Sequence, residues 1–422
     1  MKIKTLLLKT ALTAFVKAAM AFVVFFMTIA VTQTMGAEQA GLFLLAVAIL
    51  GAGSVFFRLG LDDVVLRLLS TNKGHDTSKQ IMSTGLLWII LVSSPISLLV
   101  SFYSYEIATL VFSKPDFAPI LEVSVLALPV MALTMLLAVG FQSFHRVIVT
   151  TFFQNLGHIS LFLILFTIYQ LFIPTSINAT NAMSLYLLSA MLVLLIAAYM
   201  WHKQVNGHWN KPAIVNPVMW RASSNLWMAT SMMLAVQWSG VLIAGAFVSS
   251  SEIAHLSAAQ RTASLTSFVL MVVNMVVAPR YAQLWSEGKL ADIKQLAKWS
   301  TRGMILLALP IVMLMILFST AIMSIFGEGF EQSAILLIII SAGQFINVAS
   351  GSVGYLLNMS GHEKDFRRVT FFAGPLTIIL SYILIQQYGV LGAAIATAVG
   401  LAVQNIGALF MVRKRLGFWP LG

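Results

Sequence analysis

The sequence predicts an all-α polytopic membrane protein with about twelve transmembrane helices. Hydrophobic residues make up 59% of the 422-residue chain and charged residues only 9%, whereas soluble domains need far more charge on their surfaces. Apolar stretches long enough to cross a bilayer recur along the whole chain, separated by short loops that carry the charge. Because backbone groups in a bilayer must pair within their own segment, these stretches are expected to be helical.

The first predicted span, 12–33, follows a basic start and is too long for the apolar region of a typical signal peptide. The second, 41–69, is unusually long, and its end around Arg58–Arg67 is expected to extend beyond the hydrocarbon. The other spans have ordinary lengths. They are 81–103, 119–143, 147–172 and 182–202, then 222–246, 254–281, 303–326, 333–359, 369–387 and 390–411.

Two six-helix halves are expected, 1–210 and 211–422. The basic loop 203–221 separates them, and its Pro212 and Pro217 interrupt helix continuity. With six spans each, both halves begin on the same side of the membrane. Any internal repeat is therefore parallel, related by an axis along the membrane normal.

The formal charge of +11 is explained by topology rather than by nucleic-acid binding. With the N-terminus inside, Lys114 is the one basic residue that falls in an outer loop, and the basic loops all lie inside. Positive residues collect on cytoplasmic loops. Both termini are therefore expected in the cytoplasm, for a multi-pass protein of a bacterial inner membrane. The chain has no cysteine, so disulfides, thiol catalysis and thiolate metal sites are excluded.

Several short motifs resemble one transporter family. The sequence is similar to the polysaccharide-transporter branch of the multidrug/oligosaccharidyl-lipid/polysaccharide (MOP) exporters, the Wzx-type O-antigen flippases. The resembling segments, in chain order, are Gly36-Ala-Glu38-Gln-Ala-Gly41-Leu-Phe, Arg58-Leu-Gly60-Leu-Asp62-Asp63, Ala258-Ala-Gln-Arg261, Ala278-Pro279-Arg280-Tyr-Ala282, Gly327-Glu-Gly-Phe330 and Gly389-Val-Leu-Gly392-Ala393-Ala394. At His255 the sequence departs from relatives, which commonly carry Gly there.

The resemblance implies a MATE-like fold, with two six-helix bundles around a central cavity that opens alternately to each side. It implies a cargo of undecaprenyl-pyrophosphate-linked oligosaccharide, an O-antigen-type repeat unit, moved from the inner to the outer leaflet. Besides this polyprenyl-pyrophosphate-linked glycan and membrane lipids, the expected partners are a polysaccharide polymerase and a chain-length regulator.

Three cations inside predicted spans are the best candidates for binding the pyrophosphate, because a buried charge is costly unless paired or hydrated. Arg261 has no acidic residue three or four positions away, and Arg58 and Lys17 also lie within spans. A guanidinium suits phosphate because it donates two parallel hydrogen bonds. The competing interpretation for Lys17 and Arg261 is that their long side chains reach the headgroup region.

Arg58–Asp62 and Asp63–Arg67 are two pairs spaced four residues apart, so the members of each pair share a helix face. The pairs either form a structural double ion pair at the membrane boundary or take part in ion coupling.

A second group of candidates is uncharged. Amide side chains in spans either line a sugar-binding cavity or hold helices together by hydrogen bonds. The candidates are Gln142, Asn155, Asn225, Gln237, Asn274 and Asn347.

Other function classes fit the sequence less well. No Walker motif, metal-ligand cluster or large catalytic loop is present, so we expect no enzyme activity, no cofactor and no metal. The alternative transporter is an ion-coupled multidrug or small-molecule exporter of the same superfamily. It would need acidic residues in the cavity to attract cations, whereas the buried charges here are mainly basic.

Overall fold

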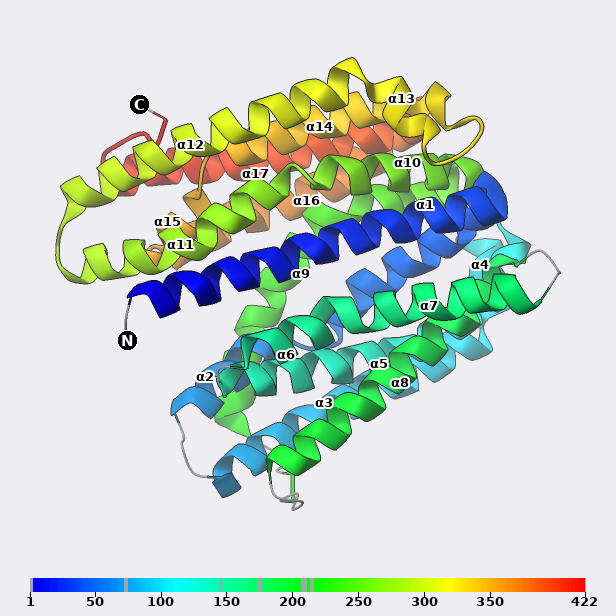
Figure 1. Cartoon of the computed structure of the whole chain (residues 1–422), viewed down its shortest axis with the longest axis horizontal. Helices are drawn as coiled ribbons and strands as arrows, with labels where there is room; N and C mark the ends of the chain where they lie inside the picture. The colour runs from blue at the N-terminus through cyan, green and yellow to red at the C-terminus, as the bar shows by residue number, and fades with distance from the viewer. Residues whose placement is uncertain are drawn as a thin grey trace. The chain divides into compact units, whose positions relative to one another are not determined.

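A computed structural model confirms the all-α fold class. It describes residues 3–71, 75–144, 146–173, 177–205, 211–212 and 216–421, and within these ranges every regular element is helical (Figure 1). Ten helices or helix pairs of the described residues are long and apolar enough to cross a membrane, or eleven if a bent pair at 148–172 is one span.

The first helix, α1 (Ile3–Phe56), contains both of the first two predicted spans and is broken at Gly36, where φ is 72° and ψ 168°. This backbone conformation is essentially restricted to glycine. The residues on the two sides of the break have different neighbours. Gln33 donates a hydrogen bond to the carbonyl of Ile325 (2.8 Å), whereas Gln39 accepts one from the backbone amide of Ala179 (3.0 Å).

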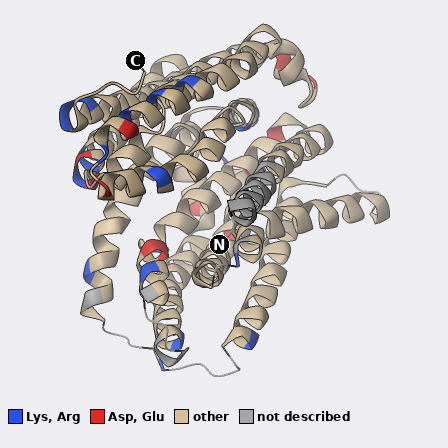
Figure 2. Cartoon of the chain, turned by 60° about the vertical axis from the view of Figure 1, so that its left-hand side comes forward, with Lys and Arg blue, Asp and Glu red and all other residues tan. Residues whose placement is uncertain are grey.

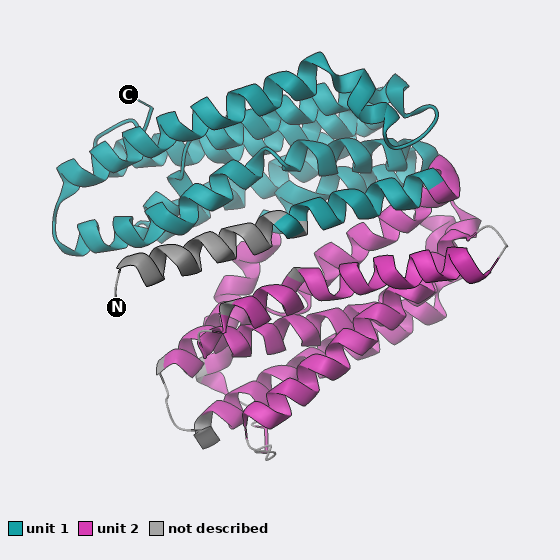
Figure 3. Ribbon diagram, in the orientation of Figure 1, with its two compact units in different colours: residues 1–33, 232–422 teal, residues 34–231 magenta. Residues whose placement is uncertain are grey.

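The chain accordingly divides into two compact units (Figure 3). Unit 1 contains Met1–Gln33 and Met232–Gly422, and unit 2 contains Thr34–Ser231. The sequence-based division at 210/211 assigns the first helix to the N-terminal half. Here its first 33 residues belong instead with the later part of the chain, because their neighbours lie there.

Unit 2 is built around one apolar cluster. Val65, Met82, Leu136 and Trp201 are all buried in it, and each comes from a different helix. Gly140 allows the closest approach, since a Cβ there would overlap Met82 and the Trp201 ring. After α1, the elements are α2 (Leu61–Thr71), α3 (His75–Phe102), α4 (Ser104–Leu110), η1 (Pro115–Phe117), α5 (Ala118–Ser143), α6 (Val147–Thr151), the π-helical turn η2 (Phe152–Leu156), α7 (Gly157–Phe172) and α8 (Ala179–Gln204).

Unit 1 contains two apolar clusters along its length. One is built around Val277, Ala297 and Val353 and the other around Met304 and Val348. The elements are α9 (Pro217–Phe247), which begins in unit 2, α10 (Ser250–Ser264), α11 (Ser267–Ser286), α12 (Leu290–Leu317), α13 (Ser319–Ser324), η3 (Phe330–Ser333), α14 (Ala334–Ala349), α15 (Val353–Met359), α16 (Glu363–Tyr388) and α17 (Val390–Leu416).

The second predicted span is wrong in one respect. It was expected as one helix over 41–69, but α1 ends at Phe56 and α2 begins at Leu61. The turn between them has positive φ at Leu59 (55°) and Gly60 (69°), and an α-helix cannot continue through that conformation. Arg58 therefore lies in a turn rather than within a helix.

The two ends of unit 1 differ in charge. Figure 2 shows Lys and Arg segments gathered toward the end that carries the C-terminus, while acidic segments without basic neighbours mark the other end. At the acidic end, Ser249 and Glu252 form a capping box at the start of α10. His255 packs there against the Phe330 ring (4.4 Å between centroids) and lies 2.8 Å from the Ser333 hydroxyl. The side chain that departs from the family pattern is thus accommodated by η3.

Candidate functional site

In unit 2, the turn that carries Arg58 is fixed to the first half of α9. The Ser223 hydroxyl donates to the carbonyl of Leu59, and the Trp227 indole donates to the carbonyl of Phe56 (2.9 Å). Gly60 lies directly against the α9 backbone, since a Cβ there would be 2.6 Å from the Trp227 nitrogen. The strained turn is therefore held by contacts from a helix more than 160 positions later in the chain.

Arg58 and Asp62 form the predicted ion pair. The Arg58 residue is only 8% exposed, and its Nε lies 2.9 Å from Asp62 Oδ2. Neither Arg58 Nε nor Asp62 Oδ1 makes a well-aligned hydrogen bond within the described part of the chain. The contact is therefore a charge pair and not a forked guanidinium–carboxylate clamp.

The environment of Asp62 favours its protonated form. Asp62 lies on α2, outside the candidate membrane spans. Burial raises the pKa of its carboxyl above the ordinary value, Arg58 acts in the opposite direction, and Asp63 raises the pKa further. Because desolvation is the largest effect, Asp62 binds a proton more readily than a carboxyl in water.

Asp63 and Arg67, the second predicted pair, are both exposed on α2. They lie on a different face from the buried Val64 and Val65. A role for this pair in ion coupling stays a prediction.

An apolar pocket of about 390 Å³ lies beside the turn in unit 2. Leu59 of the turn forms part of its wall, and the Trp88 and Trp220 rings meet edge to face there (5.8 Å between centroids). Its lining residues are Leu59, Trp88, Leu91, Val92, Asn216, Pro217 and Trp220. Except for the Asn216 amide, the lining side chains suit hydrocarbon.

In unit 1, Arg261 is half-buried in the last turn of α10. The helix begins at Ser250, so Arg261 is about three turns from its start, deeper than a residue just inside the membrane surface. The helix ends three residues later at Ser264, and α11 begins at Ser267. The neighbouring Gln260 donates a hydrogen bond to the backbone carbonyl of Gln237 on α9 (3.2 Å).

A hydrogen-bonded group of uncharged side chains joins α11 and α14. The Ser267 hydroxyl donates to Gln344 Oε1 (2.6 Å), and the same oxygen accepts from Asn347 Nδ2 (3.3 Å). The predicted candidate Asn347 therefore bonds Gln344 on its own helix, and a role for it in a sugar-binding cavity stays a prediction.

The other sequence candidates are dispersed. Gln142, Asn225 and Gln237 are exposed, and Asn225 bonds its own helix through the Arg221 carbonyl (3.1 Å). Asn274 is buried. The side chains of Lys17 and Asn155 lie outside the described residues.

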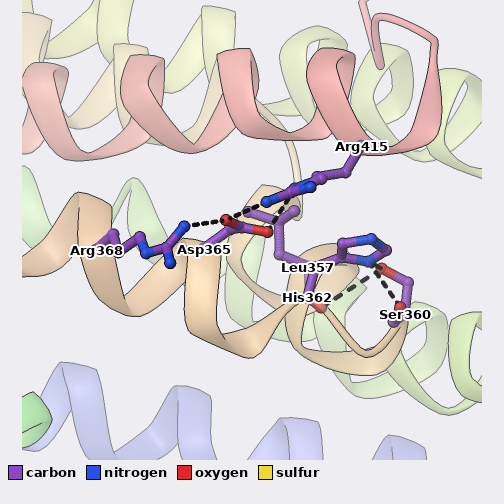
Figure 4. Close-up of polar contacts among 6 residues, drawn as sticks. All are labelled: Leu357, Ser360, His362, Asp365, Arg368 and Arg415. Atoms are coloured by element: carbon purple, nitrogen blue, oxygen red, sulfur yellow. Dashed lines mark hydrogen bonds and ion pairs between the residues drawn. The ribbon is translucent and has the colours of Figure 1, made fainter.

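The best-formed polar cluster was missed by the sequence analysis (Figure 4). Asp365, near the start of α16, accepts two hydrogen bonds from Arg415 at the end of α17, at 2.7 and 3.0 Å. Arg368 adds a third contact at 3.3 Å. The three-residue spacing of Asp365 and Arg368 was a usable signal, but Arg415 is fifty positions away, and no local pattern connects it to Asp365.

Two solved structures share this fold over nearly the whole chain. One is the Lipid II flippase MurJ in an inward closed conformation, with a TM-score of 0.76 and 14% identity over 96% of this chain and 87% of that one. The other is an inward-facing multidrug resistance MATE family transporter of the MOP superfamily, with a TM-score of 0.74 and 12% identity over 96% and 98%. At these identities the likeness establishes the fold.

Relatives in sequence are archaeal membrane proteins. A probable low-salt glycan biosynthesis flippase, Agl15 of Haloferax volcanii, is 28% identical over 170 residues, which is 40% of this chain. The matched region covers only 36% of Agl15. An uncharacterised membrane protein of Methanocaldococcus jannaschii is 23% identical over 391 residues, covering 86% of this chain and 75% of that protein.

Two family patterns match the chain. The MatE pattern matches residues 227–383, and the polysaccharide biosynthesis protein pattern matches residues 7–285. The second match covers well over half of the sequence. It agrees with the multi-pass helical fold and with the resemblance found in the motifs. The chain is therefore a multi-pass membrane protein of the polysaccharide biosynthesis protein family.

Proposed function

We propose that the protein flips a lipid-linked oligosaccharide from the inner to the outer leaflet by alternating access. The observation that carries the proposal is the family match over residues 7–285, together with relatives whose names describe them as flippases. The cargo is an undecaprenyl-pyrophosphate-linked repeat unit of the O-antigen type. A polymerase and a chain-length regulator would then use it at the outer face of a bacterial inner membrane.

In this proposal Arg58, Arg261 and Lys17 bind the pyrophosphate. The case is strongest for Arg58, because it is a buried cation whose partner Asp62 has a carboxyl pKa raised by burial. When Asp62 is protonated, Arg58 loses its counter-charge and gains affinity for an anion. Binding of the cargo and proton uptake by Asp62 are thereby coupled.

The hydrocarbon of the cargo needs an apolar environment while its glycan needs hydrogen bonds. The apolar pocket in unit 2 next to Leu59 suits the isoprenoid chain close to its phosphate. The exposed amides of Gln142, Asn225 and Gln237 are proposed to meet sugar hydroxyls.

The membrane potential supplies a driving force for this direction. An interior-negative potential favours outward movement of an anion by about 2.3 kcal/mol per charge per 100 mV. A dianionic headgroup would feel about twice that value. The return of an empty cationic site is favoured by the same field.

The test is flipping of a polyprenyl-pyrophosphate oligosaccharide in proteoliposomes of the purified full chain. Arg58→Ala, Arg261→Ala and Lys17→Ala are each expected to lower the initial rate at least about tenfold, because each removes a cation that contacts the anion. Lys414→Ala, an exposed basic residue at the end of α17, is the matched control and should flip normally. Well-folded Arg58 and Arg261 variants with wild-type rates would refute the anion-binding roles, and no flipping by the wild type would refute the function.

Two observations favour a second function. The MatE pattern over residues 227–383 and the full-length fold similarity to a multidrug transporter suit an ion-coupled exporter of small molecules. Uptake of a fluorescent cationic drug into inverted vesicles would separate the two. Drug accumulation driven by an ion gradient, with no glycan flipping, would favour the exporter.

A further inference from the structure

Three buried oxygen atoms in unit 1 have no hydrogen-bond partner within the described residues. They are Asn274 Oδ1 on α11, Thr301 Oγ1 on α12 and Ser352 Oγ directly before α15. Their residues are 9%, 1% and 5% exposed. Buried polar atoms are nearly always paired, so three unpaired oxygens in one unit require an explanation.

The three residues occupy one layer of the bundle, between the two apolar clusters of unit 1. On α12, Thr301 is flanked by Ala297 of one cluster and Met304 of the other. Around the α14–α15 break, Ser352 follows Val348 of one cluster and precedes Val353 of the other.

On α11, Asn274 comes directly after Val273, which packs against both clusters. Packing thus places an oxygen from each of three elements at the same level, with hydrocarbon on both sides.

At this layer the helix backbone is interrupted. α14 ends at Ala349 and α15 begins at Val353, with Gly351 between them at φ +82°. A Cβ on Gly351 would overlap Thr301 Oγ1, so the threonine hydroxyl lies against the interrupted backbone. Carbonyls in the last turn of a helix lack an amide partner from the next turn. At this break the carbonyls of Ile346 and Val348 accept from the Ser350 and Gly351 amides, and that of Asn347 accepts from the Ser350 hydroxyl. The backbone oxygens that the break adds to those of the side chains are therefore those of Ala349, Ser350 and Gly351.

Neutral oxygens around an interrupted helix are the ligands that transporters use for Na⁺. Divalent Ca²⁺ and Mg²⁺ usually require carboxylates as well, and the three side chains of this layer supply none. Asp365, the buried carboxylate of α16, is already engaged by two arginines. We propose that Asn274, Thr301, Ser352 and the carbonyls at the α14–α15 break bind one Na⁺ ion.

The proposed site shares no residue with those assigned to the cargo, and its test does not depend on transport. Thermal unfolding of the purified full chain is measured in NaCl, KCl and choline chloride at equal ionic strength. A ligand that binds only the folded state raises the unfolding temperature with its concentration. We expect a saturable rise in NaCl that KCl and choline chloride do not give, and one bound Na⁺ per chain by equilibrium dialysis with ²²Na⁺.

In NaCl, removing an oxygen should lower the unfolding temperature if that oxygen binds an ion. It should leave the unfolding temperature unchanged or raise it if the oxygen is an unpaired hydroxyl that binds nothing. Thr301→Val keeps the side-chain shape and removes the oxygen. In choline chloride it should be as stable as the wild type or more stable, because an unpaired buried hydroxyl is lost. In NaCl it should lose the stabilisation, with Na⁺ affinity weakened at least about tenfold. Asn274→Ala should show the same loss of affinity.

Ser97→Ala is the matched control, since Ser97 Oγ on α3 of unit 2 is also buried and unpaired. It should leave the Na⁺ response unchanged. The proposal is overturned if the wild type binds no ²²Na⁺, if KCl stabilises as well as NaCl, or if Thr301→Val retains the full response. If Asn274→Ala does not fold, the Thr301→Val titration decides alone.

Discussion

Substituting Gly60 by alanine tests whether the turn carrying Arg58 is held by α9. Gly60 has φ +69°, and its Cα faces the α9 backbone. An added Cβ would lie 2.6 Å from the Trp227 nitrogen and 2.7 Å from the Ser223 carbonyl oxygen. Both neighbours are backbone atoms, so neither can rotate away. Ser223 also donates to Leu59, which means that any shift of α9 disturbs the adjacent contact.

The expected loss of stability has two parts. A left-handed conformation costs an alanine roughly 1–2 kcal/mol relative to glycine. Forcing a methyl group into a closely packed contact costs roughly 1–3 kcal/mol more. The sum, roughly 2–5 kcal/mol, corresponds to a fall of roughly 4–20 °C in unfolding temperature at 2–4 °C per kcal/mol.

The assay is thermal unfolding in detergent, followed by tryptophan fluorescence, together with the flipping rate in proteoliposomes. Gly417→Ala is the matched control. Gly417 has φ +79° at the end of α17 but nothing within 4 Å of its added Cβ. Gly417→Ala should therefore lose only the stability that the left-handed conformation costs an alanine. Equal losses for the two variants would show that the contact with α9 is not constraining the turn. If Gly60→Ala folds, we expect slower flipping, because Arg58 and Asp62 are displaced with the turn.

Three further outcomes follow from particular contacts. Asp365→Asn should lower the free energy of unfolding by about 1–2 kcal/mol, after discounting for the partly exposed Arg415. Arg368→Lys should lower it less, because the Arg368 side chain is 72% exposed. Equal unfolding temperatures for the two variants would contradict a stabilising role for the two hydrogen bonds between Arg415 and Asp365. The pKa of Asp62 is raised in the folded state, so the folded chain binds this proton more tightly than the unfolded chain does. The stabilisation that protonation of Asp62 gives to the fold therefore grows as pH falls through the folded pKa. Asp62→Asn should therefore remove this gain in unfolding temperature at acid pH, and Asp63→Asn should reduce it, because Asp63 helps to raise the pKa of Asp62. The chain has no cysteine, so Lys294→Cys and Glu328→Cys can be labelled singly. An impermeant thiol reagent outside the cell should reach only Glu328→Cys, and the reverse result would invert the topology.

The sequence predicted the membrane fold well because its signal is local. Span length, apolar content and the placement of lysine and arginine are all set within about twenty residues. The Arg58–Asp62 pair was also predictable, since four residues separate its members. The turn at Leu59 and Gly60 was not foreseen, because Phe56–Arg67 is apolar and charged in a pattern that a continuous helix also satisfies.

Contacts between distant segments could not be read in this way. Arg415 reaches Asp365 across fifty positions, and Ser223 fixes Leu59 across 164. The unpaired oxygens of Asn274, Thr301 and Ser352 are ordinary polar residues in three separate apolar segments. Only packing shows that they share one layer.

The amino-acid order by itself determined that this chain is helical and multi-pass, because a bilayer imposes the same length and pairing requirement on each segment independently. Tertiary structure decided which segments belong together. Residues before the Gly36 break joined the later part of the chain, and a long apolar helix ended at Phe56. Those outcomes depend on side chains that meet only after folding, and so no single segment encodes them.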